Sequence, residues 1–232
     1  MSIVYLIPCF LADDAVETIP LYTLTHLKSC KYVFAENIRT ARRFLKSMDK
    51  SINIDDFIWF EIGKVEKEQK QHFINAIKSG DNIAIISEAG CPGVADPGQE
   101  LIAIAQENNC MVKPLVGPNS ILLALMASGM NGQQFEFCGY LPIDNNARVK
   151  KIKELEVQSL KFNSTKIFIE TPYRNDQLFD AIVHNCSSNT RLCLAINITS
   201  TDEKISTKSI KEWKSNKPNL HKIPVIFLLH GS

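Results

Sequence analysis

The stretch SEAGCPGVADPG, residues 87–98, follows an apolar run at residues 83–86 and precedes an apolar pattern that resumes at Leu101. It contains three glycines, two prolines and two carboxylates, but no lysine, arginine or histidine. The run before it is continuous rather than alternating, which is typical of a strand buried on both faces of a parallel sheet. Ligands of open α/β sheets bind beyond the carboxyl ends of such strands. The sequence therefore predicts an α/β fold with a ligand-binding turn at residues 87–98.

Strand-like and helix-like segments alternate on both sides of this turn, which predicts an α/β architecture with a mainly parallel first sheet. The pattern restarts after residue 130, so we expect two α/β domains, 1–117 and 118–232. The expected strands are 2–8, 31–37, 57–63, 81–87, 110–117, 135–141, 165–170, 191–198 and 223–229. The expected helices are 21–30, 38–48, 67–80, 97–109, 119–129, 147–160, 174–186 and 209–215.

The start of the helix at 97–109 carries a strong local signal. Asp96 can cap it, Pro97 suits the first helical position, and Gln99 stands three residues after Asp96, as in a capping box. We therefore expect Asp96 to act as a helix cap and not as a catalytic acid.

Composition and charge restrict the function classes. A net charge of +1 gives no global field that would attract nucleic acid, so any basic footprint must be local. The seven cysteines form no CxxC pair, which indicates reduced thiols in a cytoplasmic protein and no structural zinc. The five histidines lack ligand spacing, so we expect no metal site. No apolar run is long enough to cross a bilayer, and the N-terminus resembles a first strand more than a signal peptide.

The chemistry of the turn leaves three alternatives: a phosphate, S-adenosylmethionine or no ligand at all. A phosphate would suit the free amides of a helix N-terminus, but the turn lacks the P-loop lysine and the GxGxxG spacing. S-adenosylmethionine fits better, because adenosine needs apolar walls and approachable backbone, and a sulfonium needs no lysine or arginine. The third alternative is a glycine-rich connection that binds no ligand.

Several segments carry a resemblance to a known family. The turn, PLVGPNSILLALMASGM (114–130) and FCGYLP (137–142) resemble the tetrapyrrole methylase superfamily. AENIRTARRFLK (35–46) and IETPYR (169–174) resemble, more narrowly, its branch of ribosomal RNA 2′-O-methyltransferases, which act on a cytidine ribose in the small subunit. The resemblance runs with gaps along nearly the whole chain and is most specific over residues 85–142.

The resemblance implies a homodimer of two-domain α/β chains, with S-adenosylmethionine in a cleft between the domains. Pro8 corresponds to the loop that closes over the methyl-transfer site. The remaining cofactor contacts that the resemblance implies are Gly90, Cys91, Val94, Ser120, Ile121, Glu170, Thr171, Ile198 and Pro224.

If the acceptor is a ribose hydroxyl, a base must take its proton, and Glu36 is the best candidate. It follows an apolar strand and matches the family's glutamate, although a surface or helix-capping glutamate would look the same. Arg39 could hold a phosphate or the base of an RNA acceptor. The neighbouring cations Arg42, Arg43 and Lys46 could follow an RNA backbone or form a solvated helix face.

The chain departs from the family pattern mainly in the acceptor half. The loop at 8–14 lacks the family's Gly-Asn, Asn37 and Ile38 replace Asp-Thr, and Tyr173 replaces a histidine. Three functions stay open: methylation of a ribose in ribosomal RNA or the small ribosomal subunit, methylation of a tetrapyrrole-like small molecule, and cofactor binding without catalysis.

Overall fold

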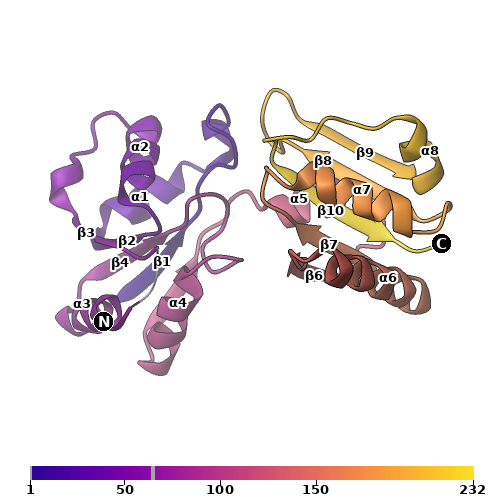
Figure 1. Ribbon diagram of the computed structural model, residues 1–232. Helices are drawn as coiled ribbons and strands as arrows, with labels where there is room; N and C mark the ends of the chain where they lie inside the picture. The colour runs from indigo at the N-terminus through magenta and orange to yellow at the C-terminus, as the bar shows by residue number, and fades with distance from the viewer. Residues whose placement is uncertain (1, 64–65) are drawn as a thin grey trace. The chain divides into compact units, whose positions relative to one another are not determined.

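The computed structural model describes residues 2–63 and 66–232, and the chain divides into two compact units, Met1–Asn119 and Ser120–Ser232 (Figure 1). Each unit is built around its own five-stranded sheet with helices packed against it. The expected fold of two α/β domains is therefore confirmed.

The sheet of the first unit has the strand order β3-β2-β4-β1-β5, and every pairing in it is parallel. The apolar run at 83–86 forms β4, between β2 and β1. Ile83 and Ile85 belong to the core on one side of the sheet, whereas Ala84 and Ile86 belong to the core on the other. This is the two-faced burial that the continuous run predicts. The strands are β1 (Ile3–Ile7), β2 (Cys30–Ala35), β3 (Ile58–Glu61), β4 (Asn82–Ile86) and β5 (Met111–Pro114).

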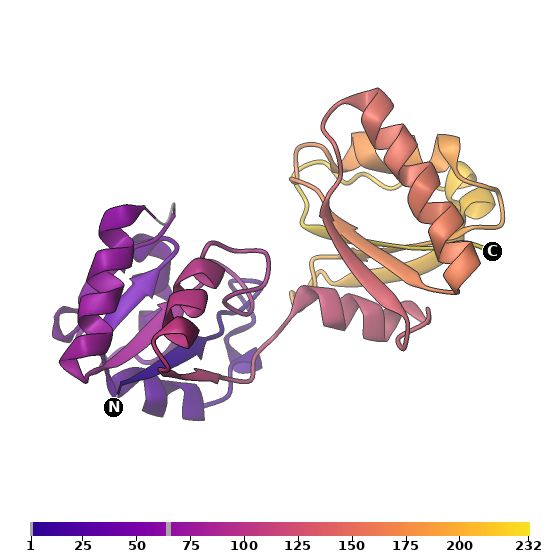
Figure 2. The same cartoon turned by 90° about the horizontal axis from the view of Figure 1, so that it is seen from below.

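The helices of the first unit cover both faces of this sheet (Figure 2). The core that contains Ala84 and Ile86 also holds Leu27 of α1 and Phe44 of α2. The opposite core takes side chains from α3 and α4. The helices are α1 (Tyr22–Lys28), α2 (Ile38–Met48), α3 (Lys67–Ser79) and α4 (Gly98–Glu107), and two 3₁₀ turns span Val16–Thr18 and Ile54–Asp56.

The sheet of the second unit is mixed, with the order β6-β7-β10-β8-β9. β6 and β7 are parallel, whereas β10 lies antiparallel between β7 and β8, and β9 pairs antiparallel with β8. The strand β9 was not predicted. The strands are β6 (Phe135–Tyr140), β7 (Thr165–Ile169), β8 (Arg191–Ile196), β9 (Lys204–Ser209) and β10 (Val225–His230), and the helices are α5 (Ser120–Ser128), α6 (Asn145–Phe162), α7 (Asn175–Asn185) and α8 (Ile210–Ser215).

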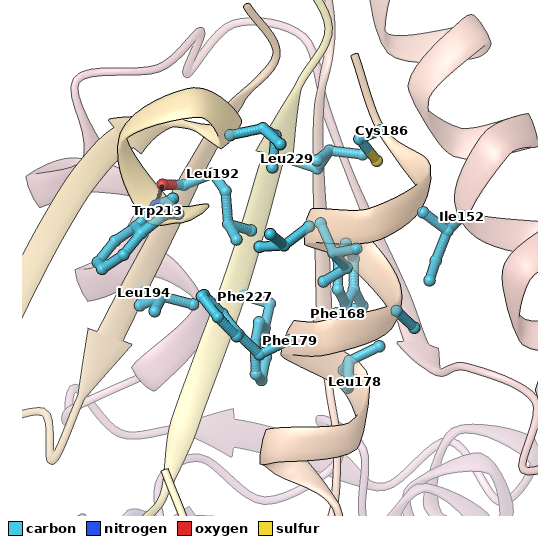
Figure 3. Close-up of a cluster of buried hydrophobic side chains, with 14 of the residues drawn as sticks. Ile152, Phe168, Leu178, Phe179, Cys186, Leu192, Leu194, Trp213, Phe227 and Leu229 are labelled. Atoms are coloured by element: carbon cyan, nitrogen blue, oxygen red, sulfur yellow. Dashed lines mark hydrogen bonds between the residues drawn. The ribbon is translucent and has the colours of Figure 1, made fainter. Parts of the chain in front are cut away.

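An aromatic cluster organises the core of the second unit (Figure 3). Phe168 and Phe227 stack across the β7–β10 pair with ring centroids 5.9 Å apart. Trp213 packs edge-on against Phe179 and donates a 2.8 Å hydrogen bond from Nε1 to the carbonyl of Leu192. Trp213 is thus a core residue.

The expected capping box at Asp96 and Gln99 is wrong. α4 begins at Gly98, one residue later than expected, and its cap residue Pro97 makes no side-chain capping bond. The Asp96 carboxylate instead spans the turn, with Oδ1 accepting from the amide of Gly98 at 2.7 Å and Oδ2 from the amide of Gly93 at 2.9 Å. Both oxygens are used within the turn, so neither reaches the amide three residues on.

All seven cysteines are free thiols, and five of them are buried. Among residues 2–63 and 66–232 there is no cluster of three or more metal-ligating side chains. Nor does this part of the chain contain a helix long and apolar enough to span a membrane.

Candidate functional site

The turn at 87–98 leaves the carboxyl end of β4 and is tied to the loop that follows β1. The amide of Cys9 donates to the carbonyl of Gly90 at 2.9 Å, and the amide of Gly90 donates back to the carbonyl of Cys9 at 3.1 Å. These two bonds fix the position of the turn against the loop that begins at Pro8.

Glycine is required at Gly90, where the backbone φ is +73°. A Cβ at this position would lie 3.3 Å from Leu11 Cδ2 and 3.5 Å from the carbonyl oxygen of Pro118. Three loops therefore meet around Gly90, which is buried and has both its backbone amide and its carbonyl bonded to Cys9. Sequence reasoning did not single out Leu11 or Pro118 as neighbours of the turn.

Cys91 and Val94 differ in their surroundings. The thiol of Cys91 lies 3.4 Å from the carbonyl oxygen of Pro118, and burial raises its pKa, an effect reinforced by the charge of Asp96 and opposed by a hydrogen bond with Asn119. Val94 is 44% exposed and offers an apolar surface on the turn. Cys91 thus remains a neutral thiol in the wall of the turn.

Burial also raises the pKa of Asp96, and the charge of Glu36 raises it further, while the two amide bonds from Gly98 and Gly93 act in the opposite direction. With both oxygens engaged by backbone amides, the carboxylate organises the turn. Each of its oxygens already accepts one backbone amide.

Glu36 stands at the same edge of the sheet, directly after β2. Its amide donates to the carbonyl of Ile86 at 3.0 Å, and its Oε2 accepts from the amide of Glu88 at 2.9 Å. The candidate base is therefore held against the first residues of the turn. The Glu88 amide was not anticipated as its partner.

Arg39 lies in the first turn of α2, and its side chain is exposed. The helix begins at Asn37, whose Oδ1 accepts from the amides of Arg39 at 2.9 Å and Thr40 at 3.2 Å. The asparagine that departs from the family pattern is thus a good helix cap. Arg39 extends from a fixed backbone but makes no contact that assigns it a role.

Four predicted residues gather at one edge of the second sheet. Glu170 and Thr171 follow β7, Ile198 follows β8, and Pro224 precedes β10, where its carbonyl accepts from the amide of Asn197 at 3.1 Å. Ser120 and Ile121 form the first turn of α5.

Glu170 is a buried charge with a nearby cation. Its side chain is 1% exposed, and its Oε1 lies 2.6 Å from Arg174 Nη2 and 2.6 Å from the amide of Thr171. Its Oε2 is buried and has no hydrogen-bond partner in this unit. Arg174, the residue before α7, thus pairs with a buried carboxylate of its own unit.

A pocket of about 310 Å³ lies in the first unit beside the turn. The loop after β1, residues of α2 and the start of the turn form its walls. Sequence reasoning did not find it, because its walls come from three separate segments. Its lining residues are Cys9, Phe10, Asp13, Thr40, Ala41, Arg43, Phe44, Ser47, Ser87 and Glu88.

Two solved structures define the class of this fold. The methyltransferase CobJ matches with a TM-score of 0.65 at 13% identity over 100% of this chain and 93% of its own. The uroporphyrin-III-C-methyltransferase of Thermus thermophilus matches with a TM-score of 0.57 at 15% identity over 98% of this chain and 94% of its own. The fold is that of the tetrapyrrole methylases.

By sequence, the chain belongs to the family of curated proteins named ribosomal RNA small subunit methyltransferase I. It is 31% identical to the Vibrio cholerae protein over 169 residues, 72% of this chain and 57% of the relative. It is 33% identical to the Bacillus subtilis protein over 183 residues, 78% of this chain and 59% of the relative. The matched part thus spans less than two thirds of these relatives. No protein-family model matches the chain.

Proposed function

We propose that this chain is an S-adenosylmethionine-dependent methyltransferase that modifies a ribose 2′-hydroxyl in small-subunit ribosomal RNA. The observation that carries the proposal is the turn at 87–98, with Gly90 in a left-handed conformation at the carboxyl edge of a parallel sheet. The name of the Vibrio cholerae and Bacillus subtilis relatives supports the choice of ribosomal RNA as the acceptor.

The turn fits the chemistry of the proposed cofactor. Val94 provides an apolar surface for an adenosine, and the missing side chain at Gly90 lets the turn pack closely against Leu11 and Pro118. No lysine or arginine lies in the turn to repel a sulfonium. Both oxygens of Asp96 accept backbone amides within the turn, and we propose that its role is to hold the turn in shape. We assign Gly90, Cys91 and Val94 to the cofactor site, with Pro8 in the adjoining loop.

In the second unit, we retain Glu170, Thr171, Ile198 and Pro224 as proposed cofactor contacts. Their gathering at one sheet edge supports the assignment, as does the unpartnered Oε2 of Glu170, which can accept a hydrogen bond. Ser120 and Ile121 are retained as contacts at the start of α5.

When bound, S-adenosylmethionine supplies a methyl group already activated by its sulfonium, so the chain must position the acceptor and remove one proton. We propose Glu36 as the proton acceptor. The Glu88 amide holds one carboxylate oxygen at 2.9 Å, which orients the group and leaves the second oxygen for the ribose hydroxyl. Arg39, three residues further along the chain, is proposed to bind a phosphate of the RNA.

The test is transfer of labelled methyl from S-adenosylmethionine to small ribosomal subunits, compared with free ribosomal RNA and a small-molecule extract. We expect incorporation into subunit RNA at a 2′-hydroxyl. Calorimetry with S-adenosylmethionine tests the shared premise, since no binding at millimolar cofactor would exclude a role for the turn as its site.

Two alternatives have separate signatures. A tetrapyrrole-like acceptor would give labelled small molecules and unlabelled RNA. Loss of catalysis would give cofactor binding without transfer. The two Cys9–Gly90 bonds argue against a collapsed loop, because the altered segment 8–14 is still tied to the turn.

We further propose that the chain works as a homodimer in the cytoplasm. Exposed apolar side chains one helical turn apart on α5, Leu122 and Met126, support a contact with a second copy. Light scattering coupled to size-exclusion chromatography tests this state, and a monomer at micromolar concentration would contradict it.

A further inference from the structure

The pocket of about 310 Å³ in the first unit has a chemistry that the proposed cofactor does not use. It is bounded by Phe10 and Asp13 from the loop after β1, by Arg43 and Phe44 from α2, and by Glu88 from the turn. Its walls therefore combine two aromatic rings with charges of both signs.

The charged side chains of this pocket are not paired with one another. Among the described residues, Asp13, Arg43 and the carboxylate of Glu88 form no ion pair. The adjacent Arg42 behaves differently, because its guanidinium lies over the Trp59 ring at 5.2 Å. Unpaired charges of both signs around one hollow suit a ligand that carries both hydrogen-bond donors and acceptors.

The aromatic residues suit a flat ligand. Phe10 and Phe44 meet edge to face, with ring centroids 5.4 Å apart, and both line the pocket. Bases extruded from RNA are commonly held against aromatic side chains and read by hydrogen bonds along their edges.

We propose that this pocket receives the base of the target nucleotide, extruded from the RNA; this inference rests on the proposed function. The two carboxylates would accept from an exocyclic amino group, and Arg43 would donate to a carbonyl oxygen of the base. Cytosine and guanine present both kinds of group on one edge, whereas uracil has no amino group. Arg43 and Asp13 are thus specificity-determining residues, and Arg43 reads the base and not the RNA backbone.

The position of the pocket relative to the turn agrees with this role. Ser87 and Glu88 belong to both the pocket and the turn, and the Glu88 amide is bonded to Glu36 at 2.9 Å. A base in the pocket would place its ribose near the proposed proton acceptor. The Cys9–Gly90 bonds hold the loop wall of the pocket against the turn.

The direct test is a titration of the full chain with cytidine, guanosine and uridine at millimolar concentration, followed by amide chemical shifts. We expect cytidine or guanosine to shift the signals of Phe10, Thr40 and Ser47, and uridine to bind at least about tenfold more weakly. Arg43→Ala should weaken binding of the preferred nucleoside by about tenfold, whereas the matched variant Arg42→Ala should bind like the wild type.

Ribose 5-phosphate serves as the control for backbone recognition. If it shifts the same signals as strongly as the nucleosides do, or if Arg43→Ala binds nucleosides like the wild type, the base-pocket assignment is overturned.

Methyl transfer separates this inference from the proposed function. If the wild-type chain binds cofactor and nucleoside but does not label RNA, the proposed function is refuted and the assignment of the pocket to a base still stands. If both Arg43→Ala and Asp13→Ala label RNA as well as the wild type does, the assignment of the pocket to a base is refuted and the proposed function still stands. We expect Arg43→Ala and Asp13→Ala each to raise KM for the RNA by about tenfold and to leave the affinity for the cofactor unchanged.

Discussion

Gly117 and Pro8 lie in such close contact that a Cβ on Gly117 would stand 2.1 Å from Pro8 Cβ and 2.4 Å from Pro8 Cγ. The proline ring is rigid and buried, so it cannot turn aside as a flexible side chain would. The loop after β1 and the loop after β5 therefore fit together only because residue 117 has no side chain. This contact holds Pro8 beside the turn that we propose to bind the cofactor.

Replacement of Gly117 by alanine should force these loops apart. Overpacking of this kind typically costs about 1–3 kcal/mol, and we expect a loss of that size in urea unfolding together with weaker S-adenosylmethionine binding. Gly132→Ala is the matched control, because a Cβ at that position meets nothing within 4 Å. Equal stability of the two variants would show that the loops can move apart freely.

Alanine at Gly90 should damage the proposed cofactor site beyond its effect on stability. Gly90 has a φ of +73° and Gly129 a φ of +66°, so Gly90→Ala and Gly129→Ala both pay a backbone cost of about 1–2 kcal/mol. Only the Cβ at residue 90 meets neighbours, at 3.3 Å and 3.5 Å. We expect similar losses of thermal stability but a loss of cofactor affinity, measured by calorimetry, in Gly90→Ala alone.

Glu36→Gln tests the proposed proton acceptor with little change in shape. The amide oxygen of glutamine can still accept from the Glu88 amide, so folding and cofactor affinity should be kept. The rate of methyl transfer should fall by about 10²–10⁴-fold, as is usual when a general base is removed. Glu61→Gln is the control, since Glu61 also accepts from a backbone amide, that of Ile38 at 3.2 Å. Wild-type turnover by Glu36→Gln would exclude Glu36 as the base.

Local patterns were sufficient for the first unit. The apolar run at 83–86 predicted a strand buried on both faces, and β4 pairs with a strand on each side. The second sheet shows where such patterns fail. β10 inserts antiparallel between β7 and β8, and no local signal specifies which strands a terminal segment will join. β9 was missed because KISTKS (204–209) is a polar edge strand, paired only with β8.

In the candidate site, too, some residues could be predicted from local sequence and others could not. Gly90 and Cys91 could be found because glycine and turn chemistry are local. The contact of Gly117 with Pro8 and the bond from the Glu88 amide to Glu36 join segments far apart in sequence, so only the folded chain reveals them.

His230, at the end of β10, should make the stability of the chain depend on pH. It is buried, and its Nε2 lies 3.1 Å from Asn163 Oδ1. Burial lowers the pKa of His230 from 6.5, and the charge of Arg191 lowers it further, against a backbone hydrogen bond with Gly231.

The pKa of His230 is lower in the folded state than in the unfolded state. As the pH falls below 6.5, the unfolded chain therefore takes up a proton on His230 before the folded chain does. Its contribution to stability is therefore complete above that pH and is lost progressively below it, by at most about 1.4 kcal/mol per pH unit. Urea unfolding across this range should show the loss in the wild type, and His230→Gln, which cannot take up the proton, should have a flatter profile. If both proteins lose stability equally on acidification, another group is responsible, and NMR titration of the His230 ring would then give a pKa at or above 6.5.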